Sequence, residues 1–265
     1  MTTGVLIFAY NNEHIDYLAM ANWSAKNIRR HLNLPVAVVT NVAPSRNYKF
    51  EQVIIAETKG INTRKFNDLP ESVTWYNGNR VDAYTLSPWK QTLVLDADYI
   101  VASDQLNIIL KTKQNFIAHK NAYDVTNNPA FDEHNIFGRT HMPMWWATVM
   151  MFRRSTEAEM IFNCMTMIKN NWDHYRNLYG VSQRTYRNDF ALSIALGIVN
   201  GHTLTHSAIP WDLPSVSHEH KLTQIAEDKY RIEFTQNNKL QYITLNQDFH
   251  AMGKGQLGAI VENNS

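Results

Sequence analysis

The chain has 265 residues, of which 44% are hydrophobic, and it carries a formal net charge of +1. This length lies near the upper limit for one domain, and the hydrophobic fraction is sufficient for a sizeable core. The near-neutral charge excludes a protein that coats nucleic acid by bulk electrostatics, although it leaves room for a local basic groove.

The chain contains one cysteine, which excludes a disulfide within it. Cys164 lies among apolar residues at helical spacing, and this pattern predicts a buried thiol rather than a nucleophile. No stretch reaches the roughly 18 apolar residues that cross a membrane, and the first residues lack the basic segment of a secretory signal. We therefore expect a cytoplasmic protein with no membrane partner.

The N-terminal segment has the pattern of a strand, a helix and a strand. Residues 4–10 form a continuous apolar run, residues 13–32 carry apolar side chains at helical period, and residues 35–40 are again apolar. This order predicts a βαβ unit, but no glycine fingerprint for a dinucleotide follows the first strand. Tyr10, at the end of that strand, either stacks on a nucleotide base or is a packed aromatic residue.

A third strand is predicted at residues 50–56, and the polar segment 59–79 is predicted to form a flap beside a nucleotide. Residues 80–86 indicate a short helix that ends at Ser87-Pro88 and leads into the next strand. Arg80 on this helix either holds a phosphate or sugar hydroxyl, or is a surface arginine in solvent.

The most informative stretch is the apolar segment 92–95, which runs directly into Asp96 and Asp98. It is typical of a buried strand that ends at a functional edge, where two carboxylates one residue apart project to the same side. Mg²⁺ and Mn²⁺ take one or two protein carboxylates and complete their coordination with water and substrate phosphate. The segment therefore predicts a metal site for a nucleoside diphosphate. The alternative is that both acids cap the following turn or face water.

The second half of the chain is less regular. A helix is predicted at 105–111, strands at 115–119 and 145–152, a long polar loop at 121–143, and a hairpin at 230–245. Asn188 and Asp189 open an apolar helix, where they either cap it or point into a cleft. The glycine-bearing segment 248–255 is predicted to be a loop that offers one imidazole and one ammonium group.

Together these features resemble nucleotide-sugar glycosyltransferases of the GT-A fold, and most of all the retaining branch with glycogenin and bacterial galactosyltransferases. The resemblance is carried by the aromatic end of the first strand, the segment 80–88 that leads to Asp96 and Asp98, the Asn188-Asp189 helix start, and a final His-x-x-Gly-Lys. It implies a single α/β domain over residues 1–265, with a mostly parallel central sheet and helices on both faces.

The resemblance also implies roles for individual residues. It places a manganese or magnesium ion on Asp96, Asp98 and His250, and the donor diphosphate on Gly253 and Lys254. Further nucleotide contacts are expected from Ala9, Tyr10 and Arg80, and sugar contacts from Asn188 and Asp189. The implied reaction is transfer of a sugar, with retention, from a nucleoside diphosphate sugar such as a UDP-sugar to a hydroxyl. The proline and tryptophan that usually follow the lysine are replaced here by residues 255–257.

Residues 8–12 and the pair Trp145-Trp146 also look like glycosyltransferases of tailed bacteriophages, some of which modify hydroxymethylated pyrimidines in DNA. This similarity implies hydroxymethylated DNA as the acceptor, and the host cytoplasm as the location. Five arginines are expected to flank one cleft with the tryptophans: Arg139, Arg153, Arg154, Arg184 and Arg187. The alternatives are a glycan, lipid or protein acceptor, a nucleotidyltransferase, and a nucleotide-sugar binding module without catalysis.

Overall fold

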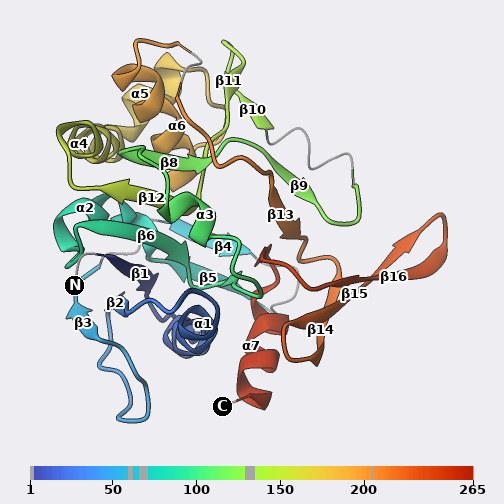
Figure 1. The fold of residues 1–265 in the computed structure, drawn as a ribbon. Coiled ribbons are helices and arrows are strands. Elements are labelled where there is room, and N and C mark those ends of the chain that lie inside the picture. Colours follow the sequence, from blue (N-terminus) through green and yellow to red (C-terminus); the bar gives the residue numbers. More distant parts are fainter. Residues whose placement is uncertain (1–2, 59–61, 66–70, 129–134, 204–205, 265) are drawn as a thin grey trace.

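The structure is a computed structural model that describes residues 3–58, 62–65, 71–128, 135–203 and 206–264 (Figure 1). Its centre is a six-stranded sheet with the order β3-β2-β1-β6-β12-β8. The strands are β1 (Thr3–Ala9), β2 (Val36–Thr40), β3 (Gln52–Ile55), β6 (Gln91–Asp96), β8 (Phe116–His119) and β12 (Trp146–Arg153). The first four in spatial order are parallel, and β12 runs antiparallel to both of its neighbours.

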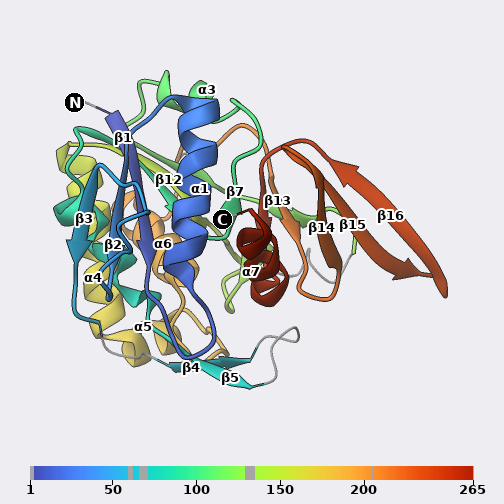
Figure 2. The same cartoon turned by 90° about the horizontal axis from the view of Figure 1, so that it is seen from below.

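Helices cover both faces of this sheet, as Figures 1 and 2 show. Helix α1 (Tyr17–Leu32) packs against β1 and β2 on one face. Helices α4 (Thr156–Asn170) and α6 (Asn188–Val199) lie against each other on the opposite face, where α6 contacts β12. The predicted α/β architecture, with a mostly parallel central sheet between helices, is confirmed.

Helix α1 begins later than the predicted residue 13. Asp16 is its N-cap, and the Asp16 carboxylate accepts a hydrogen bond of 2.8 Å from the amide of Ala19. The preceding residues are held in a turn, because the side chain of Asn12 accepts a bond of 2.9 Å from the amide of Ile15. Side-chain capping fixes the first turn of the helix here, and apolar periodicity alone does not reveal it.

The C-terminal half adds two smaller sheets. One has the order β7-β17-β13-β9, and the other is an antiparallel meander, β14-β15-β16, that projects from the body of the molecule (Figures 1 and 2). The bounds are β7 (Tyr99–Ile100), β9 (Ala122–Asp124), β13 (Leu213–Val216), β17 (Phe249–Ala251), β14 (Lys221–Ala226), β15 (Lys229–Gln236) and β16 (Lys239–Leu245). The predicted hairpin is confirmed, and its turn residues Asn237 and Asn238 have φ angles of 51° and 58°.

Several predicted segments differ in detail. The predicted helix at 80–86 is a 3₁₀ helix, η1 (Asn77–Asp82), followed by the single turn α2 (Ala83–Leu86). The predicted loop at 248–255 instead forms β17 and the start of helix α7 (Lys254–Asn263). The remaining short elements are β4 (Asn62–Lys65), β5 (Ser72–Trp75), α3 (Asn107–Leu110), β10 (Ile136–Phe137), β11 (Met142–Pro143) and α5 (Trp172–Leu178).

The predicted flap at 59–79 thus contains the β4–β5 hairpin, and the predicted loop at 121–143 contains β9, β10 and β11. Residues 59–61 and 66–70 of the flap, and 129–134 of the loop, lie outside the described residues.

The apolar side chains buried by these elements form one contiguous core that extends from β1 to α7. Cys164 on α4 belongs to it, with 7% of the residue exposed, and burial raises the pKa of its thiol to about 11. The predicted buried thiol is therefore confirmed. No helix in the described part of the chain has the length and apolar character needed to cross a membrane.

Candidate functional site

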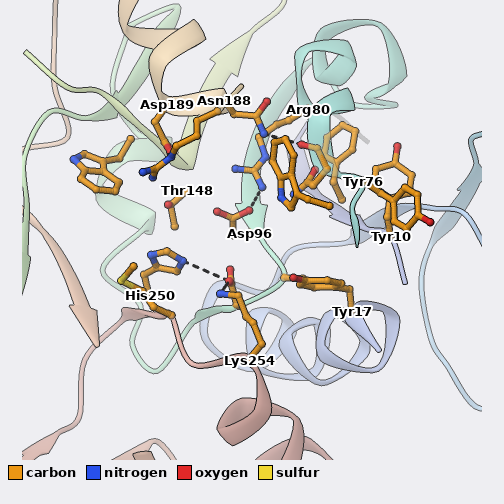
Figure 3. A pocket seen from close by; sticks show the side chains of 18 of the residues that line it. Tyr10, Tyr17, Tyr76, Arg80, Asp96, Thr148, Asn188, Asp189, His250 and Lys254 are labelled. Carbon is orange, nitrogen blue, oxygen red and sulfur yellow. Dashed lines mark hydrogen bonds and ion pairs between the residues drawn. The ribbon is translucent and has the colours of Figure 1, made fainter. Parts of the chain in front are cut away.

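A cavity of about 250 Å³ lies beyond the carboxyl ends of β1 and β6 (Figure 3). The strand ends contribute Tyr10 and Asp96 to its wall, because parallel strands deliver their C-terminal residues to the same edge of a sheet. Segments distant in the sequence complete the wall, including the start of α6 and the segment that leads from β17 into α7. We call it the Asp96 cavity.

The predicted metal ligands come together in this cavity. Asp96 ends β6, Asp98 lies in the turn after it, and the pairing of β17 with β7 places His250 opposite Tyr99. One candidate ligand atom from each of Asp96, Asp98 and His250 lies within 4.8 Å of the others, and His250 Nε2 is 3.5 Å from Asp98 Oδ2. Two carboxylates and one imidazole form a donor set that could hold a divalent metal ion.

The state of Asp98 also fits a metal ligand. Burial alone would raise the pKa of this carboxyl, since only 7% of the residue is exposed. The charges and hydrogen bonds of Lys254 and His250 outweigh that effect and hold the pKa of Asp98 below its usual value. The carboxylate is therefore ionised at neutral pH, as metal coordination requires.

Each carboxylate of the cavity is paired with a cation. Arg80 contacts Asp96 (Figure 3), and Lys254 contacts Asp98. In addition, Arg80 donates a bond of 2.8 Å to the carbonyl of Ala147, and Lys254 donates one of 3.1 Å to the carbonyl of Ala251. Arg80 is 3% exposed, so the surface alternative for this arginine is wrong. Both cations are fixed in position and face the cavity.

The third carboxylate, Asp189, lies in the first turn of α6. It accepts a bond of 2.9 Å from the amide of Ala147 on β12 and forms an ion pair of 2.8 Å with Arg187. Burial opposes its ionisation, but Arg187, the Ala147 amide and Arg80 together hold the pKa of Asp189 below its usual value. The N-cap of α6 is Arg187. Neither Asn188 nor Asp189 caps the helix, and the capping alternative is wrong.

Asn188 lines the Asp96 cavity, and its amide group joins two other segments. It donates a bond of 2.8 Å to the carbonyl of Asn77 in η1 and accepts one of 3.2 Å from the hydroxyl of Tyr186. These bonds tie the start of α6 to the helix that carries Arg80. The structure thus gives Asn188 a positioning function, and its predicted contact with the sugar stays a prediction.

An aromatic wall lies on one side of the cavity, formed by Tyr10, Tyr17 and Tyr76 (Figure 3). Tyr10 is 2% exposed, and burial raises the pKa of its phenol to about 12. It is therefore a packed aromatic residue that also lines the cavity. Ala9 is buried within β1, and Gly253 is the N-cap of α7. Ala9 and Gly253 are not among the residues that line the cavity. Their predicted contacts with the nucleotide would have to come from the backbone.

Sequence reasoning missed several residues of the wall, among them Tyr17, Tyr76, Thr148, His218 and Met252. Figure 3 shows Thr148 between Asp189 and His250. The only signal for Thr148 in the sequence is its position two residues after Trp146 on β12. Those tryptophans do not act as a pair, since Trp146 lines the Asp96 cavity and Trp145 lines another.

The five arginines predicted to flank one cleft do not gather there. Of these, Arg187 lines the Asp96 cavity and Arg139 lines a different one. The guanidinium of Arg153 donates to the carbonyls of Leu110 and Thr112 at 3.1 and 2.6 Å. That of Arg154 donates to the carbonyl of Ser87 at 2.6 Å and lies 4.7 Å above the ring of Tyr84.

No protein-family profile matches the sequence, and no curated protein sequence matches it. Among solved structures, the glycosyltransferase GlyE of Streptococcus pneumoniae TIGR4 aligns over 79% of this chain and 46% of its own, at 11% identity and a TM-score of 0.44. The galactosyltransferase LgtC, in complex with donor and acceptor sugar analogs, aligns over 73% of this chain and 70% of its own, at 13% identity and a TM-score of 0.47. The chain thus matches less than half the length of GlyE. A likeness this distant leaves the function to be inferred from the site.

Proposed function

We propose that this chain is a metal-dependent glycosyltransferase that moves a sugar from a nucleoside diphosphate sugar to a hydroxyl group. The observation that carries the proposal is the group Asp96, Asp98 and His250, with candidate ligand atoms within 4.8 Å of one another beside a cavity. Mn²⁺ or Mg²⁺ in such a site keeps positions open for substrate phosphate. When bound, the ion would offset the charge that develops on the leaving diphosphate.

The charges of the cavity suit this donor. Asp96, Asp98 and Asp189 are balanced by Arg80, Lys254 and Arg187, so the cavity is close to neutral without a ligand. A divalent ion together with a doubly ionised diphosphate ester would preserve this balance. Lys254 also begins α7, and the N-terminus of a helix favours an anion. We therefore assign Lys254 and Arg80 to the diphosphate, with Gly253 contributing through its backbone.

The aromatic wall gives the nucleotide a place. Tyr10, Tyr17 and Tyr76 present rings on the side of the cavity away from Asp189, where a base and ribose would lie against them (Figure 3). We propose UDP as the nucleotide, in keeping with the resemblance found in the sequence. The sugar would then lie toward Asp189 and Asn188.

Asp189 is suited to stabilise positive charge rather than to remove a proton. A general base works best when its pKa is near the operating pH. The pKa of Asp189 is held below its usual value, with Arg187 and the Ala147 amide among the causes. It would therefore steady the charge on the anomeric carbon and contact sugar hydroxyls. Because no base for inversion is supplied by this residue, we propose transfer with retention.

The acceptor that we propose is a carbohydrate hydroxyl. A DNA acceptor would need cations along its phosphate backbone. Of the five arginines expected to supply them, Arg153 and Arg154 donate instead to backbone carbonyls, and Arg139 lines a different cavity. Hydroxymethylated DNA therefore loses the main argument in its favour.

The test is to incubate the protein with Mn²⁺ and a panel of nucleoside diphosphate sugars, and to identify the products by mass spectrometry. Release of nucleoside diphosphate with free or transferred sugar, abolished by a chelator, supports the proposal. Release of pyrophosphate would instead indicate a nucleotidyltransferase, and tight binding without turnover would indicate a binding module. Proton NMR of the first anomer formed decides between retention and inversion.

A further inference from the structure

A second cavity, of about 690 Å³, lies near the C-terminal half of α6, at the end of the molecule opposite α7 (Figure 1). It is lined by Trp145, by Ser193 and Gly197 of α6, by Asn200, which is the C-cap of that helix, and by Tyr179 at the end of α5. We call it the Trp145 cavity. It shares no lining residue with the Asp96 cavity. Its volume lies in the range of roughly 300–1,000 Å³ that is usual for small-molecule sites.

The charges of the Trp145 cavity exclude the ligands of the Asp96 cavity. Among the described residues that line it there is no carboxylate, and Lys120 is the one cation. Its three histidines do not form a metal site, because the metal-ligand group found in the described part of the chain is that of Asp96, Asp98 and His250. A divalent ion would have no carboxylate to bind, and a diphosphate would have a single cation. A neutral ligand does not need such charges.

The walls combine aromatic rings with neutral polar groups. The rings of Trp145 and His206 meet edge to face with centroids 5.5 Å apart, and those of Tyr179 and His202 lie 5.9 Å apart. The amide of Asn200 adds donors and an acceptor to the wall. Rings beside amide and imidazole groups suit a ligand that has both an apolar face and several hydroxyls.

His206 gives a specific reason to expect such a ligand. Its Nε2 is buried and has no hydrogen-bond partner among the described residues, whereas the ring is held by a hydrogen bond to the backbone of Phe116. Burial lowers the pKa of this imidazole, so the ring is neutral at pH 7. A buried polar atom without a partner costs free energy. A rotation of this half-buried ring toward the cavity would let a ligand hydroxyl remove that cost.

The walls of the two cavities are linked by hydrogen bonds through Ser193. Ser193 lies one helical turn after Asp189, and its hydroxyl donates a bond of 2.7 Å to the Asp189 carbonyl. The same hydroxyl accepts a bond of 2.7 Å from the amide of Trp145, the residue before Trp146. Ser193 lies in the wall of the Trp145 cavity, so one helical turn of α6, about 5–6 Å, separates this wall from Asp189. An oligosaccharide whose end lies at Asp189 is long enough to span that distance.

We propose that the Trp145 cavity binds a pyranose ring of the acceptor glycan, away from the sugar that receives the new bond. This assignment of a second carbohydrate site rests on the proposed transferase function. It makes the acceptor an oligosaccharide rather than a monosaccharide. The rings of Tyr179 and Trp145 supply the apolar contact, and His206 and Asn200 bind hydroxyls.

Two variants test the site in opposite ways. Tyr179→Ala removes a ring from the wall. Gly197→Leu fills the cavity from α6, and a Cβ at this position meets only the ends of two side chains, Met142 Cε at 3.0 Å and His202 Nδ1 at 3.2 Å, among its nearest neighbours. Leucine also favours a helix more than glycine does, and a melting temperature close to that of the wild type is required to show that the variant is folded. Tyr242→Ala, which removes a tyrosine that is 69% exposed on β16, is the control.

The probes are the oligosaccharides retained by the wild-type protein on a glycan array, and the methyl pyranosides of their component sugars. Titration calorimetry should show oligosaccharide binding that weakens about tenfold in Tyr179→Ala and Gly197→Leu and is unchanged in Tyr242→Ala. Equal binding by wild type and Gly197→Leu would overturn the proposal. Methyl pyranosides that bind as tightly as the oligosaccharides would overturn the glycan assignment in favour of a free sugar.

Hydrolysis of the donor by water separates this proposal from the proposed function, because it needs no acceptor. If the wild type and both variants hydrolyse the donor equally while oligosaccharide transfer falls only in the variants, both proposals stand. If no donor is hydrolysed but Gly197→Leu still abolishes glycan binding, the carbohydrate site stands and its role in an acceptor is refuted. If hydrolysis occurs and neither variant changes glycan binding or transfer, the second site alone fails.

Discussion

The two cavities along α6 differ in how they hold polar groups. In the Asp96 cavity, three buried or half-buried carboxylates each contact a cation, and the strand ends and the start of α6 supply them. In the Trp145 cavity the polar groups are imidazoles, an amide and hydroxyls, and no described lining residue is acidic. The first arrangement suits an ionic ligand with a metal, and the second suits a neutral one.

The difference has an energetic cause. A buried charge costs several kcal/mol unless it is paired, and removal of one partner leaves the other without compensation. The Asp96 cavity tolerates its acids because Arg80, Lys254 and Arg187 are fixed beside them. A divalent metal ion bound together with a doubly charged diphosphate would leave the net charge of the cavity unchanged. The Trp145 cavity contains no such pairs, so its preference rests on shape and hydrogen bonds.

The largest effect is expected from Asp98→Asn, which removes a charged ligand atom from the metal group. Donor turnover should fall by roughly 100-fold or more. The variant would bind the metal ion less tightly, and that ion would offset the negative charge that develops on the leaving diphosphate. Calorimetric titration with Mn²⁺ should show the matching loss of metal binding. Asp104→Asn, at an exposed acid close by in the sequence, is the control. Metal-dependent donor binding that survives in Asp98→Asn would refute the metal assignment.

A smaller loss, of roughly 100-fold at most, is expected from Asp189→Asn. Asparagine retains an oxygen for the Ala147 amide but breaks the ion pair with Arg187. The maximal rate should fall while donor binding changes little, because Asp189 would act on the sugar rather than on the nucleotide. Asp173→Asn is the matched control, since Asp173 is also an acid in the first turn of a helix but is 86% exposed. An unchanged rate in Asp189→Asn would show that this carboxylate has only a structural function.

The part of the Asp96 cavity that the sequence predicts well is the part built from strand ends. Asp96 and Asp98 follow a run of apolar residues, and a buried strand that ends in two acids has few purely structural explanations. The cation partners could not be paired with them in advance. Arg80 and Lys254 lie 16 and 156 residues from their carboxylates in the sequence, and only the tertiary fold brings them together.

The regions that were mispredicted have local causes. Helix α7 begins after Gly253 and contains Gly255 and Gly258, and glycine lowers helix propensity, so packing against α1 rather than local preference must stabilise it. The two tryptophans were expected to lie at one cleft together with the five arginines. Adjacent residues at a strand point to opposite faces, and this alternation sends Trp145 and Trp146 to different cavities.

The buried imidazole of His119 offers a test by pH. His119 ends β8, where burial lowers its pKa from the usual 6.5 to about 4. Below pH 6.5 the unfolded chain therefore takes up a proton that the folded chain does not, so stability falls as the pH decreases toward 4. The loss between pH 7 and pH 5 should be roughly 2 kcal/mol in the free energy of unfolding.

Urea denaturation at the two pH values measures this loss. His119→Gln should reduce the difference between them, because glutamine does not titrate. His174→Gln, at an exposed histidine on α5, should leave it unchanged. The same pH dependence in His119→Gln and in the wild type would mean that His119 is not the group responsible.

The smallest effects, about tenfold or less, are expected from a matched pair of substitutions on β12 and the residue before it, and they test the contrast between the cavities most directly. Trp146→Phe keeps an aromatic ring but reduces the wall of the Asp96 cavity, so donor hydrolysis should slow. Trp145→Phe changes the other wall, so donor hydrolysis should stay the same while the KM for an oligosaccharide acceptor rises. Because the two positions are adjacent and the chemical change is identical, a general loss of stability would affect both variants alike. Equal effects of the two substitutions on donor hydrolysis would show that the cavities do not act separately.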